Sequence, residues 1–383
     1  PALAPRPRRS LALTAALTML CRALLLLVAS ASATNLLSLR GGQKEKEKVA
    51  IIGSGNWGSA IAKIIGRNVL ALDNYDDEVC MWVFEEDING KKLTEIINTE
   101  HENVKYLPGI KFTENVKAVP DVTDAVKDAT MLVFVLPHQF LTRTCPKITG
   151  YASGCRALSL IKGIEFSETG PILISDMIKD EMKGMDVSVL MGANVANEVA
   201  RDEFCESTVG YKVKAHGEAF QAMLDCPTFR VGQIQDVAGT ELCGALKNVV
   251  ALGAGFCDGL ELGGNTKAAI IRIGLKETMK FAKMFFKGIK DETFMESCGL
   301  ADLVTTCFGG RNRKCAEAFA RKEGTWDEIE ADKLNGQKLQ GTITCKDVMV
   351  VLKNKGVEDQ FPLFKRINEI AFEGAPVETI IEL

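Results

Sequence analysis

The chain has 383 residues, enough for two domains with sizeable cores, and its 46% hydrophobic content is typical of a globular protein. Its net charge of −4 is unevenly distributed: residues 1–44 hold six basic residues and no acidic one, which leaves 40 basic against 50 acidic residues, or −10, in the remainder. This excess of acidic residues after residue 44 argues against nucleic acid as a partner. Three histidines, and twelve cysteines without a C-x-x-C pair, give no metal-ligand spacing, so we predict no metal site.

Residues 1–43 carry the pattern of a targeting presequence and linker. Arginines near the first residue precede an apolar stretch over 11–29 and the small residues of 31–33, the order found in a secretory signal. One arginine interrupts the apolar stretch, so we expect no stable membrane span in the mature chain. The next segment, 34–42, bears an arginine and no acid, as transit peptides do. This arrangement resembles the two-part presequences of algae with complex plastids, so we predict an organelle and favour a plastid. A mitochondrion or the secretory pathway stays an alternative.

A glycine-rich segment, Gly53-Ser-Gly-Asn-Trp-Gly58, follows the apolar run 49–52 and precedes a helical pattern over 59–65. A strand that leads into G-x-G-x-x-G and then into a helix is the dinucleotide-binding fingerprint. The first glycine permits a tight turn, the second lets the backbone approach a pyrophosphate, and the third lets the helix pack on the strand. A glycine-rich turn that serves packing alone is the alternative. We assign to the cofactor site Gly53, Ser54, Gly55, Asn56, Trp57 and Gly58.

Short β-branched runs alternate with helical patterns up to about residue 235. The runs predict strands over 79–84, 131–136, 157–161, 187–191 and 228–231, and helical patterns lie over 87–100, 138–147, 171–183 and 216–225. This alternation predicts an α/β domain over 44–235, a Rossmann-like, doubly wound and mostly parallel sheet with helices on both faces. Beyond it, helical patterns over 236–258, 267–290, 312–322 and 343–355 predict an all-helical domain over 236–383.

Two acidic residues, Glu85 and Glu86, follow Phe84 at the end of the second predicted strand. A carboxylate there can bind the adenosine ribose and repel a 2′-phosphate, which favours NAD over NADP. The separation from the glycines is longer than usual, because 68–78 has the composition of an extended connection. Solvated loop acids fit this spacing equally well.

An apolar helix rich in small residues is predicted over 242–255, interrupted by Lys247 and Asn248. A lysine that loses solvent on such a helix has a lowered pKa suited to proton transfer, although a snorkelling or ion-paired lysine fits as well. Lys162 lies just after a predicted strand, where doubly wound sheets bind ligands and where charged loop residues are also common. His138 fits either an acid–base role or the start of a helix.

A second glycine-rich turn, Cys307-Phe-Gly-Gly-Arg-Asn-Arg-Lys314, leads into a basic helix start. Backbone N–H groups, the helix dipole and an arginine fork together suit a phosphate, while a turn before a solvated helix is the alternative. The polar loop 335–341 is uninformative by itself.

Six segments together resemble the eukaryotic NAD-dependent glycerol-3-phosphate dehydrogenases, over a range from about Val49 to near the C-terminus. They are Gly53-Ser-Gly-Asn-Trp-Gly58, Leu136-Pro-His-Gln-Phe140, Ser159-Leu-Ile-Lys-Gly163, Cys243-Gly-Ala-Leu-Lys-Asn248, Gly309-Gly-Arg-Asn-Arg313 and Asn335-Gly-Gln-Lys-Leu-Gln340. The resemblance implies a reversible hydride transfer between NADH and dihydroxyacetone phosphate that gives sn-glycerol 3-phosphate. It also implies a homodimer, and cytosolic members of the family lack the presequence.

The resemblance implies a role for individual residues. Lys247 is the implied general acid and base, and Asp302 is a candidate to orient it. The implied catalytic residues are Lys247, Lys162 and Asp302; the implied substrate residues are Lys162, Asn248, Thr306, Arg311 and Asn312. The implied cofactor residues are Phe84, Phe140, Arg311, Lys338 and Gln340, the last two after their loop closes.

Two local departures from the family stand near the start of the helical region: Gly264 replaces a usual acid, and segment 236–240 lacks a second acid. Other interpretations are a hydroxyacid or opine dehydrogenase with a helical second domain, or a non-catalytic NADH-binding sensor. A phosphate-free substrate would make the Arg311 turn unnecessary, and a sensor has no need of Lys247 beside Asn248. Both points favour the phosphate-specific enzyme.

Overall fold

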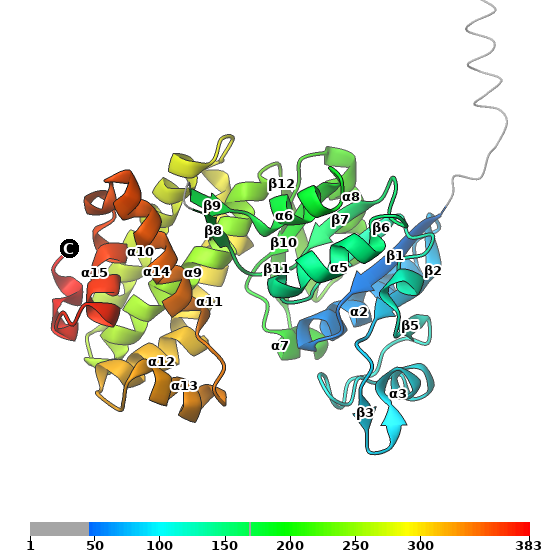
Figure 1. Ribbon diagram of the computed structural model, residues 1–383, viewed down its shortest axis with the longest axis horizontal. Helices are drawn as coiled ribbons and strands as arrows, with labels where there is room; N and C mark the ends of the chain where they lie inside the picture. The colour runs from blue at the N-terminus through cyan, green and yellow to red at the C-terminus, as the bar shows by residue number, and fades with distance from the viewer. Residues whose placement is uncertain (1–45, 168–169) are drawn as a thin grey trace, which may run out of the picture. The chain divides into compact units, whose positions relative to one another are not determined.

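The computed structural model describes residues 46–167 and 170–383 (Figure 1). The predicted presequence, residues 1–43, lies outside the described residues. None of the helices in the described ranges combines the length and the apolar composition that crossing a membrane requires.

The first part of the described chain builds one sheet of eight strands in the order β12-β11-β10-β7-β6-β1-β2-β5. Neighbouring strands run parallel except β10 and β11, which are antiparallel, so the prediction of a mostly parallel sheet is confirmed. The strands are β1 (Glu47–Ile52), β2 (Tyr75–Trp82), β5 (Val116–Val119), β6 (Met131–Phe134), β7 (Arg156–Ser159), β10 (Asp186–Met191), β11 (Cys205–Gly210) and β12 (Phe229–Ile234).

Helices cover both faces of this sheet, because successive side chains of a strand point to opposite sides. In β1, Val49 and Ile51 pack into the core that α2 and α8 complete, while Ala50 and Ile52 pack into the core that α5 and α6 complete. Burial on both faces explains why the central strands are almost continuously apolar. The helices are α2 (Asn56–Val69), α3 (Leu93–Glu100), α4 (Val122–Ala125), α5 (Leu141–Ile148), α6 (Ile174–Glu181), α7 (Ala196–Ala200) and α8 (Lys214–Leu224), with the 3₁₀ turn η1 (His138–Phe140) before α5.

The helical pattern predicted over 87–100 is wrong in its first part. A two-stranded hairpin, β3 (Asp87–Ile88) with β4 (Lys91–Lys92), occupies that part, and α3 follows it. Between the two strands Asn89 and Gly90 have φ angles of 53° and 82°, the left-handed geometry of a two-residue turn that Asn-Gly favours. The turn therefore overrides the helical periodicity.

The predicted extended connection over 68–78 is also wrong, because α2 continues to Val69 and β2 already begins at Tyr75. Two strands of the sheet, β5 and β11, have no counterpart among the predicted ones. β5 has four residues and β11 begins Cys-Glu-Ser-Thr, so neither presents a long apolar run. A second hairpin, β8 (Glu165–Ser167) with β9 (Gly170–Ile172), falls where no strand was predicted.

From Val237 to the C-terminus the described chain contains helices and turns, as predicted, and no strand. Three of its helices, α11, α13 and α15, have no counterpart among the predicted patterns. The helices are α9 (Val237–Gly259), α10 (Gly264–Phe285), α11 (Asp302–Gly309), α12 (Arg311–Ala320), α13 (Trp326–Leu334), α14 (Gln340–Lys355) and α15 (Pro362–Phe372). The short 3₁₀ segments are η2 (Glu292–Met295), η4 (Glu358–Gln360) and η5 (Val377–Ile381), and η3 (Ser297–Ala301) is a short π-helix.

Helix α9 packs against α10, α11, α12 and α14, which makes it the central helix of this second region, and most of its residues are buried. A Cβ added at Gly255 would lie 2.3 Å from the carbonyl oxygen of Arg313, and one added at Gly259 would lie 2.5 Å from the Cβ of Ala320. Residues without side chains therefore let α12 approach α9 closely. This confirms the prediction of a central helix built from small residues.

The two local departures from the family fall at the starts of helices. Gly264 is the first residue of α10. Asp236 caps α9: its carboxylate accepts hydrogen bonds from the N–H of Gly239 (2.8 Å), the N–H of Lys290 (2.9 Å) and the hydroxyl of Thr293 (2.6 Å). The segment 236–240 is therefore an ordered helix start.

Candidate active site

The first glycine-rich turn joins β1 to α2 in the geometry that the fingerprint requires. Gly53 has a φ of +122°, and a Cβ at that position would lie 2.8 Å from the carbonyl oxygen of Val135. A Cβ at Gly58 would lie 2.4 Å from the carbonyl oxygen of Gly53, so the helix packs directly on the turn. A Cβ at Gly55, by contrast, would meet no atom within 4 Å. The backbone at the N-terminus of α2 is thus open to a ligand, which fits a dinucleotide pyrophosphate.

A buried asparagine that the sequence analysis missed holds this turn in place. The amide of Asn103 donates to the carbonyl of Ser54 (2.8 Å) and to the hydroxyl of Ser59 (2.9 Å). The amide of Asn56 donates to the carbonyl of Tyr106 at 2.7 Å, so the same segment contacts the turn twice. Asn103 lies in no recognisable motif, and its role depends on contacts 44 and 49 residues away in the chain.

Side chains around the turn serve different purposes. The indole of Trp57 packs against the ring of Phe229, with 6.4 Å between centroids, and so belongs partly to the core. Phe84, after β2, and Phe140, in η1, are 72% and 47% exposed. Exposed aromatic rings beyond strand ends are available to a planar ligand.

The carboxylates after β2 are bonded to protein groups. Glu85 accepts from the N–H of Thr94 (3.2 Å) and from its hydroxyl (2.6 Å), at the start of α3. Glu86 pairs with Lys105 and accepts from the hydroxyl of Tyr106 at 3.0 Å. Both carboxylates therefore have fixed positions next to the second strand.

Two lysines and one aspartate from distant parts of the chain meet at the start of α11. Asp302 is buried; its Oδ1 lies 2.5 Å from Nζ of Lys247 on α9, and its Oδ2 lies 3.2 Å from Nζ of Lys162 after β7. Lys162 also donates to the carbonyl of Gly192 after β10, at 3.0 Å. The hydroxyl of Thr306 lies 3.5 Å from Oδ1 of Asp302. The structure thus brings together all three predicted catalytic residues, and we call Lys162, Lys247 and Asp302 the charged trio.

The environment of Lys247 adjusts its acidity. Burial disfavours the ammonium form and lowers the pKa of Lys247 from 10.5 to about 8, and the neighbouring Lys162 acts in the same direction. The carboxylate of Asp302 opposes both effects. A lysine with a pKa near 8 exchanges a proton readily close to neutral pH. Of the interpretations that the sequence left open, the ion-paired lysine and the proton-transfer lysine are both compatible with this geometry.

The second glycine-rich turn leads into α12 beside the same helix. The amide of Asn312 donates to Oδ1 of Asn248 at 3.0 Å, next to Lys247 on α9. Its oxygen accepts from the N–H of Gly341 at 2.8 Å, so Asn312 joins α9, α12 and α14. Arg311 is exposed and donates to the side chain of Gln337 at 3.2 Å. Four of the predicted substrate residues, Asn248, Thr306, Arg311 and Asn312, therefore lie on adjoining helices, whereas Lys162 follows β7.

The loop between α13 and α14 holds its own polar residues. Lys338 is paired with Asp327 at 2.6 Å and with Glu330 at 2.8 Å, both on α13. The N–H of Leu339 donates to the other oxygen of Glu330 at 3.0 Å. Gln340 donates to Thr344 of its own helix at 3.3 Å. In this conformation Lys338 and Gln340 contact the helical region, and their part in a cofactor site stays a prediction.

His138 begins η1, and its Nε2 lies 2.7 Å from a carboxylate oxygen of Glu165 in β8. A Cβ added at Gly163 would lie 3.4 Å from Nδ1 of His138, so the ring lies beside the residue that follows Lys162. Its partner is a carboxylate outside the charged trio, and its position is that of a helix start.

Known proteins are similar to this chain over both of its regions. Two family models match the chain: the N-terminus of NAD-dependent glycerol-3-phosphate dehydrogenase over residues 48–216, and the C-terminus over 236–382. The glycerol-3-phosphate dehydrogenase 1-like protein of Mus musculus is 56% identical over 336 residues, which cover 87% of this chain and 95% of that protein. The cytoplasmic NAD(+) glycerol-3-phosphate dehydrogenase of Homo sapiens is 54% identical over 337 residues, 88% of this chain and 96% of that protein.

A solved structure is similar over the same range. Glycerol-3-phosphate dehydrogenase from Saccharomyces cerevisiae has a TM-score of 0.85 and 46% identity, over 88% of this chain and 99% of that one. The likeness therefore spans both the sheet and the helical region.

Proposed function

The chain belongs to the NAD-dependent glycerol-3-phosphate dehydrogenase family, and we propose how its own residues carry out the reaction. The enzyme oxidises glycerol 3-phosphate to dihydroxyacetone phosphate and catalyses the reverse reduction. In the oxidation, carbon 2 loses a hydride and its hydroxyl loses a proton. NAD, when bound, takes up the hydride, and the protein must accept the proton and hold the phosphate.

Lys247 is the proposed group that exchanges this proton. In the oxidation its neutral amine accepts the hydroxyl proton; in the reduction its ammonium returns a proton to the oxygen that becomes negative. The single observation that carries this proposal is the charged trio, which places a buried lysine with a pKa of about 8 against one carboxylate. Asp302 orients the ammonium, and Lys162 adds a second positive charge that stabilises the developing oxyanion.

The phosphate end of the substrate is assigned to the start of α12. Arg311 supplies a fork of N–H donors, and the N-terminus of α12 adds backbone N–H groups and a partial positive charge. Asn312 and Asn248 are bonded to each other, so each has its orientation set before substrate arrives. Thr306, one turn after Asp302, contributes a hydroxyl to the same pocket.

For the cofactor we propose the main chain of the first glycine-rich turn as the pyrophosphate site, with Gly53, Ser54, Gly55, Asn56, Trp57 and Gly58. The open space at Gly55 supports this assignment. The exposed rings of Phe84 and Phe140 supply apolar surface beside it. Arg311, Lys338 and Gln340 are proposed to join after the loop between α13 and α14 moves, which requires Lys338 to leave Asp327 and Glu330.

One set of assays tests the substrate and the proton donor. NADH oxidation is measured for the chain starting at Lys44, with dihydroxyacetone phosphate and with unphosphorylated dihydroxyacetone, and we expect turnover only with the phosphate ester at low substrate concentration. Lys247→Met keeps the stem volume and removes the charge, so kcat should fall by about 10²–10⁴-fold or more while NADH affinity changes little.

Lys63→Met is the matched control. Lys63 also shares a carboxylate with a second cation, since Asp202 binds both Lys63 (2.6 Å) and Arg67 (2.9 Å), but it lies outside the charged trio. Its kcat should stay within a few-fold of wild type. A folded Lys247→Met enzyme with near wild-type kcat would move the proton-transfer role to Lys162.

Two further proposals concern the whole protein. We propose that residues 1–43 direct the chain to an organelle, with a plastid as the favoured destination, because the segment is basic, partly apolar and free of acids. Fusion of these residues to a fluorescent protein tests this, and a fusion that stays in the cytosol contradicts it. We also propose a homodimer from the family resemblance; a solution mass equal to that of one chain at micromolar concentration contradicts that proposal.

A further inference from the structure

A carboxylate outside the charged trio binds two cations that come from different helices. Asp258, near the end of α9, pairs with Nζ of Lys267 through both of its oxygens, at 2.9 and 2.7 Å. It also accepts a hydrogen bond from the guanidinium of Arg313 at 2.9 Å. Lys267 lies on α10 and Arg313 on α12, so this carboxylate joins three helices. We call Asp258, Lys267 and Arg313 the Asp258 cluster.

The two cations of the Asp258 cluster hold the second glycine-rich turn before and after its glycines. The ammonium of Lys267 lies over the ring of Phe308, 4.3 Å from the ring centroid, and Phe308 directly precedes the two glycines. Arg313 lies in the first turn of α12, two residues after Arg311. Through these contacts Asp258 connects both ends of the turn to α9.

The first glycine of this turn is not held by packing. A Cβ added at Gly309 would meet no atom within 4 Å. Glycine also adopts more backbone conformations than other residues, so an unpacked glycine leaves the chain free to change direction. The direction in which α12 leaves the turn therefore depends on contacts of the flanking residues, and the Asp258 cluster supplies such contacts on both sides.

The charge of Asp258 compensates the starts of two helices. Neither α10 nor α12 has an acidic residue in its first turn, where Lys267 and Arg313 lie. A helix N-terminus carries about half a positive charge, which disfavours a cation there. Asp258 itself lies at the C-terminal end of α9, where the charge of the helix end disfavours an anion.

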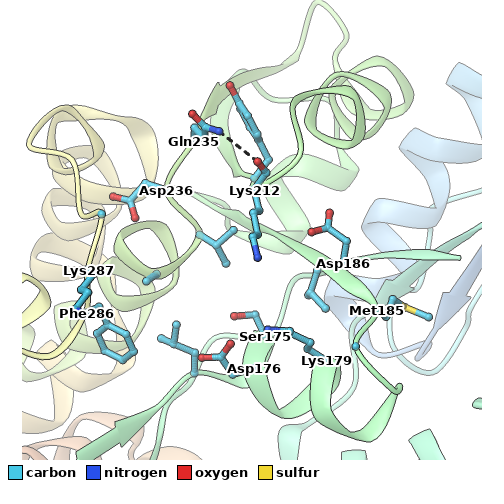
Figure 2. Close-up of a pocket in the computed structure, with 17 residues that line it drawn as sticks. Ser175, Asp176, Lys179, Met185, Asp186, Lys212, Gln235, Asp236, Phe286 and Lys287 are labelled. Carbon is cyan, nitrogen blue, oxygen red and sulfur yellow. Dashed lines mark hydrogen bonds between the residues drawn. The ribbon is translucent and has the colours of Figure 1, made fainter. Parts of the chain in front are cut away.

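The aspartate at the other end of α9 has a different role. Figure 2 shows Asp236 at the start of this helix. Its carboxylate caps the helix by accepting from the N–H of Gly239 at 2.8 Å. Capping of its own helix explains the position of Asp236, whereas contacts with Lys267 and Arg313 explain the position of Asp258.

Little further negative charge is close to Arg313. It pairs with Glu317 of α12 at 2.6 Å, but Glu317 also pairs with Arg321 at 2.7 Å. The side chains of Asp258, Lys267 and Arg313 are only 21%, 10% and 15% exposed, so solvent screens their interactions weakly. Removal of Asp258 would leave three cations with one carboxylate.

Arg311 has a different kind of partner from Arg313. It donates to the neutral side chain of Gln337 at 3.2 Å. The ion pairs of α12 in the described part of the chain are those of Arg313 and Arg321. The charge of Arg311 is therefore available to an anion, while that of Arg313 is already compensated.

We propose that Asp258 is a positioning residue for the substrate phosphate. It holds the start of α12 in the geometry in which Arg311 and the first N–H groups of the helix face the phosphate, and it keeps Arg313 from competing for the same anion. Lys247 and Asp258 are eleven residues apart on α9, about 16 Å along the helix axis, so Asp258 acts on the phosphate end of the substrate and not on proton transfer. The proposal rests on the phosphate assignment made in the proposed function.

Asp258→Asn, which keeps the shape of the side chain and removes its charge, is the test. Steady-state kinetics of the full chain are measured with dihydroxyacetone phosphate and with unphosphorylated dihydroxyacetone, at saturating NADH. We expect KM for dihydroxyacetone phosphate to rise at least about tenfold while kcat changes little. Because dihydroxyacetone has no phosphate, its kcat/KM should stay within about twofold of wild type. Equal losses with the two substrates, or an unchanged KM for the phosphate ester, would overturn the proposal.

Asp202→Asn is the matched control, because Asp202 also binds two cations, a lysine and an arginine of α2, away from the turn. Its KM for dihydroxyacetone phosphate should equal that of the wild type. Lys267→Met leaves the pair between Asp258 and Arg313 in place and so disturbs folding less. It should raise the same KM a few-fold, which keeps the proposal testable if Asp258→Asn does not fold. An unchanged KM in Lys267→Met would contradict the proposal.

The double variant Asp258→Asn, Arg311→Ala separates this proposal from the proposed function. Since Asp258 acts through the turn that presents Arg311, the double variant should lose little more kcat/KM for dihydroxyacetone phosphate than Arg311→Ala alone. Losses that multiply would overturn the proposal. If Arg311→Ala itself left the KM unchanged, the phosphate assignment would be wrong and this proposal with it. A loss in Arg311→Ala without one in Asp258→Asn would leave the phosphate site in place and overturn only the role of Asp258.

Discussion

The proposed cofactor side and the proposed substrate side of the candidate active site are built from different parts of the chain: one from main chain, the other from side chains. The cofactor side is a main-chain turn of six consecutive residues, whose glycines set its shape and leave room for a ligand. The substrate side is a set of side chains from α9, α11, α12 and the strand end at Lys162, held by mutual hydrogen bonds and ion pairs. The first depends on backbone geometry and the second on charge balance, so different substitutions should disable them.

The largest effect should follow from removing the shared carboxylate. Asp302→Asn leaves Lys162 and Lys247 close together without a counter-charge, and kcat should fall by about 10²–10⁴-fold. Because Asp302 opposes the lowering of the pKa of Lys247, its loss should shift that pKa below about 8. The high-pH limb of the reduction rate, where Lys247 loses its proton, should move to lower pH. If the high-pH limb of the rate profile stayed unchanged, Asp302 would have no effect on the pKa of Lys247.

A smaller but specific loss should follow from Arg311→Ala. Removal of a charge-assisted contact to a phosphate costs about 2–5 kcal/mol, or roughly 30- to 5000-fold in substrate affinity. NADH affinity should change far less. Arg321→Ala, at the other end of α12, is the control, since Arg321 is paired with Glu317 at 2.7 Å away from the turn. Equal losses of substrate and NADH affinity would indicate a structural arginine.

The cofactor side is tested by two alanine substitutions in the same turn. Gly55→Ala adds a methyl group where no protein atom lies within 4 Å, so thermal stability should stay unchanged while NADH binding weakens by about tenfold. Gly58→Ala places a methyl group 2.4 Å from the carbonyl of Gly53, and the overpacking should cost about 1–3 kcal/mol of stability. Calorimetric unfolding of both variants measures the change in stability, and NADH titration of both measures the change in cofactor affinity. If Gly55→Ala bound NADH as tightly as the wild type, the assignment of the pyrophosphate site to this turn would be wrong.

The smallest expected effect is a change in the unfolding free energy with pH. Burial raises the pKa of Glu241 and of Glu277 from 4.5 to about 7. A group whose pKa is raised by folding stabilises the protein below its unfolded pKa and loses that contribution as pH rises through its folded pKa. Unfolding free energy should therefore decrease between about pH 5 and pH 8, by on the order of 1–3 kcal/mol for each residue.

Glutamine variants distinguish the two positions. Oε1 of Glu241 accepts from the N–H groups of both Ile174 (2.5 Å) and Ser175 (3.2 Å), so the single oxygen of Glu241→Gln can keep both bonds and should flatten the pH dependence. Glu277 uses one oxygen for Leu363 (2.8 Å) and the other for Phe364 (2.9 Å), so Glu277→Gln should flatten the pH dependence as well but also lose one of these hydrogen bonds, at a cost of about 1 kcal/mol of unfolding free energy. Urea unfolding at pH 5.5 and 8 measures both. An unchanged pH slope in Glu241→Gln would contradict the assignment.

What the sequence predicts well is local. The strand over 131–134, the glycine-rich turn and the small-residue helix α9 each follow from a short run of neighbouring residues. The hairpin at Asn89-Gly90 was missed because the helical periodicity around it outweighed a two-residue turn signal. The polar strand β11 was missed because it is recognisable mainly by its pairing with β10 and β12.

The candidate site also has one part that neighbouring residues predict and another part that depends on contacts between distant residues. The cofactor turn was predictable from residue order, whereas the charged trio joins residues 55 and 140 positions apart and entered the prediction through family resemblance. Asn103 was not predicted by either route, since a buried amide that supports a turn leaves no spacing pattern. The partners of Lys338 on α13 were equally hidden, because α13 itself had no predicted counterpart.

The connection between α13 and α14 is short and anchored at its far end. Leu339 is bonded to Glu330 and Gly341 to Asn312, so residues 335–338 form the stretch that can swing between fixed points. Four residues span at most about 14 Å when extended, so the tip of a loop pinned at both ends travels only about half of that distance. A cover of this reach can shield the neighbourhood of Arg311 from water but cannot enclose a whole dinucleotide. Movement of this loop should therefore leave the adenine end of the proposed cofactor site uncovered by it, and we expect analogues modified at that end to remain usable coenzymes.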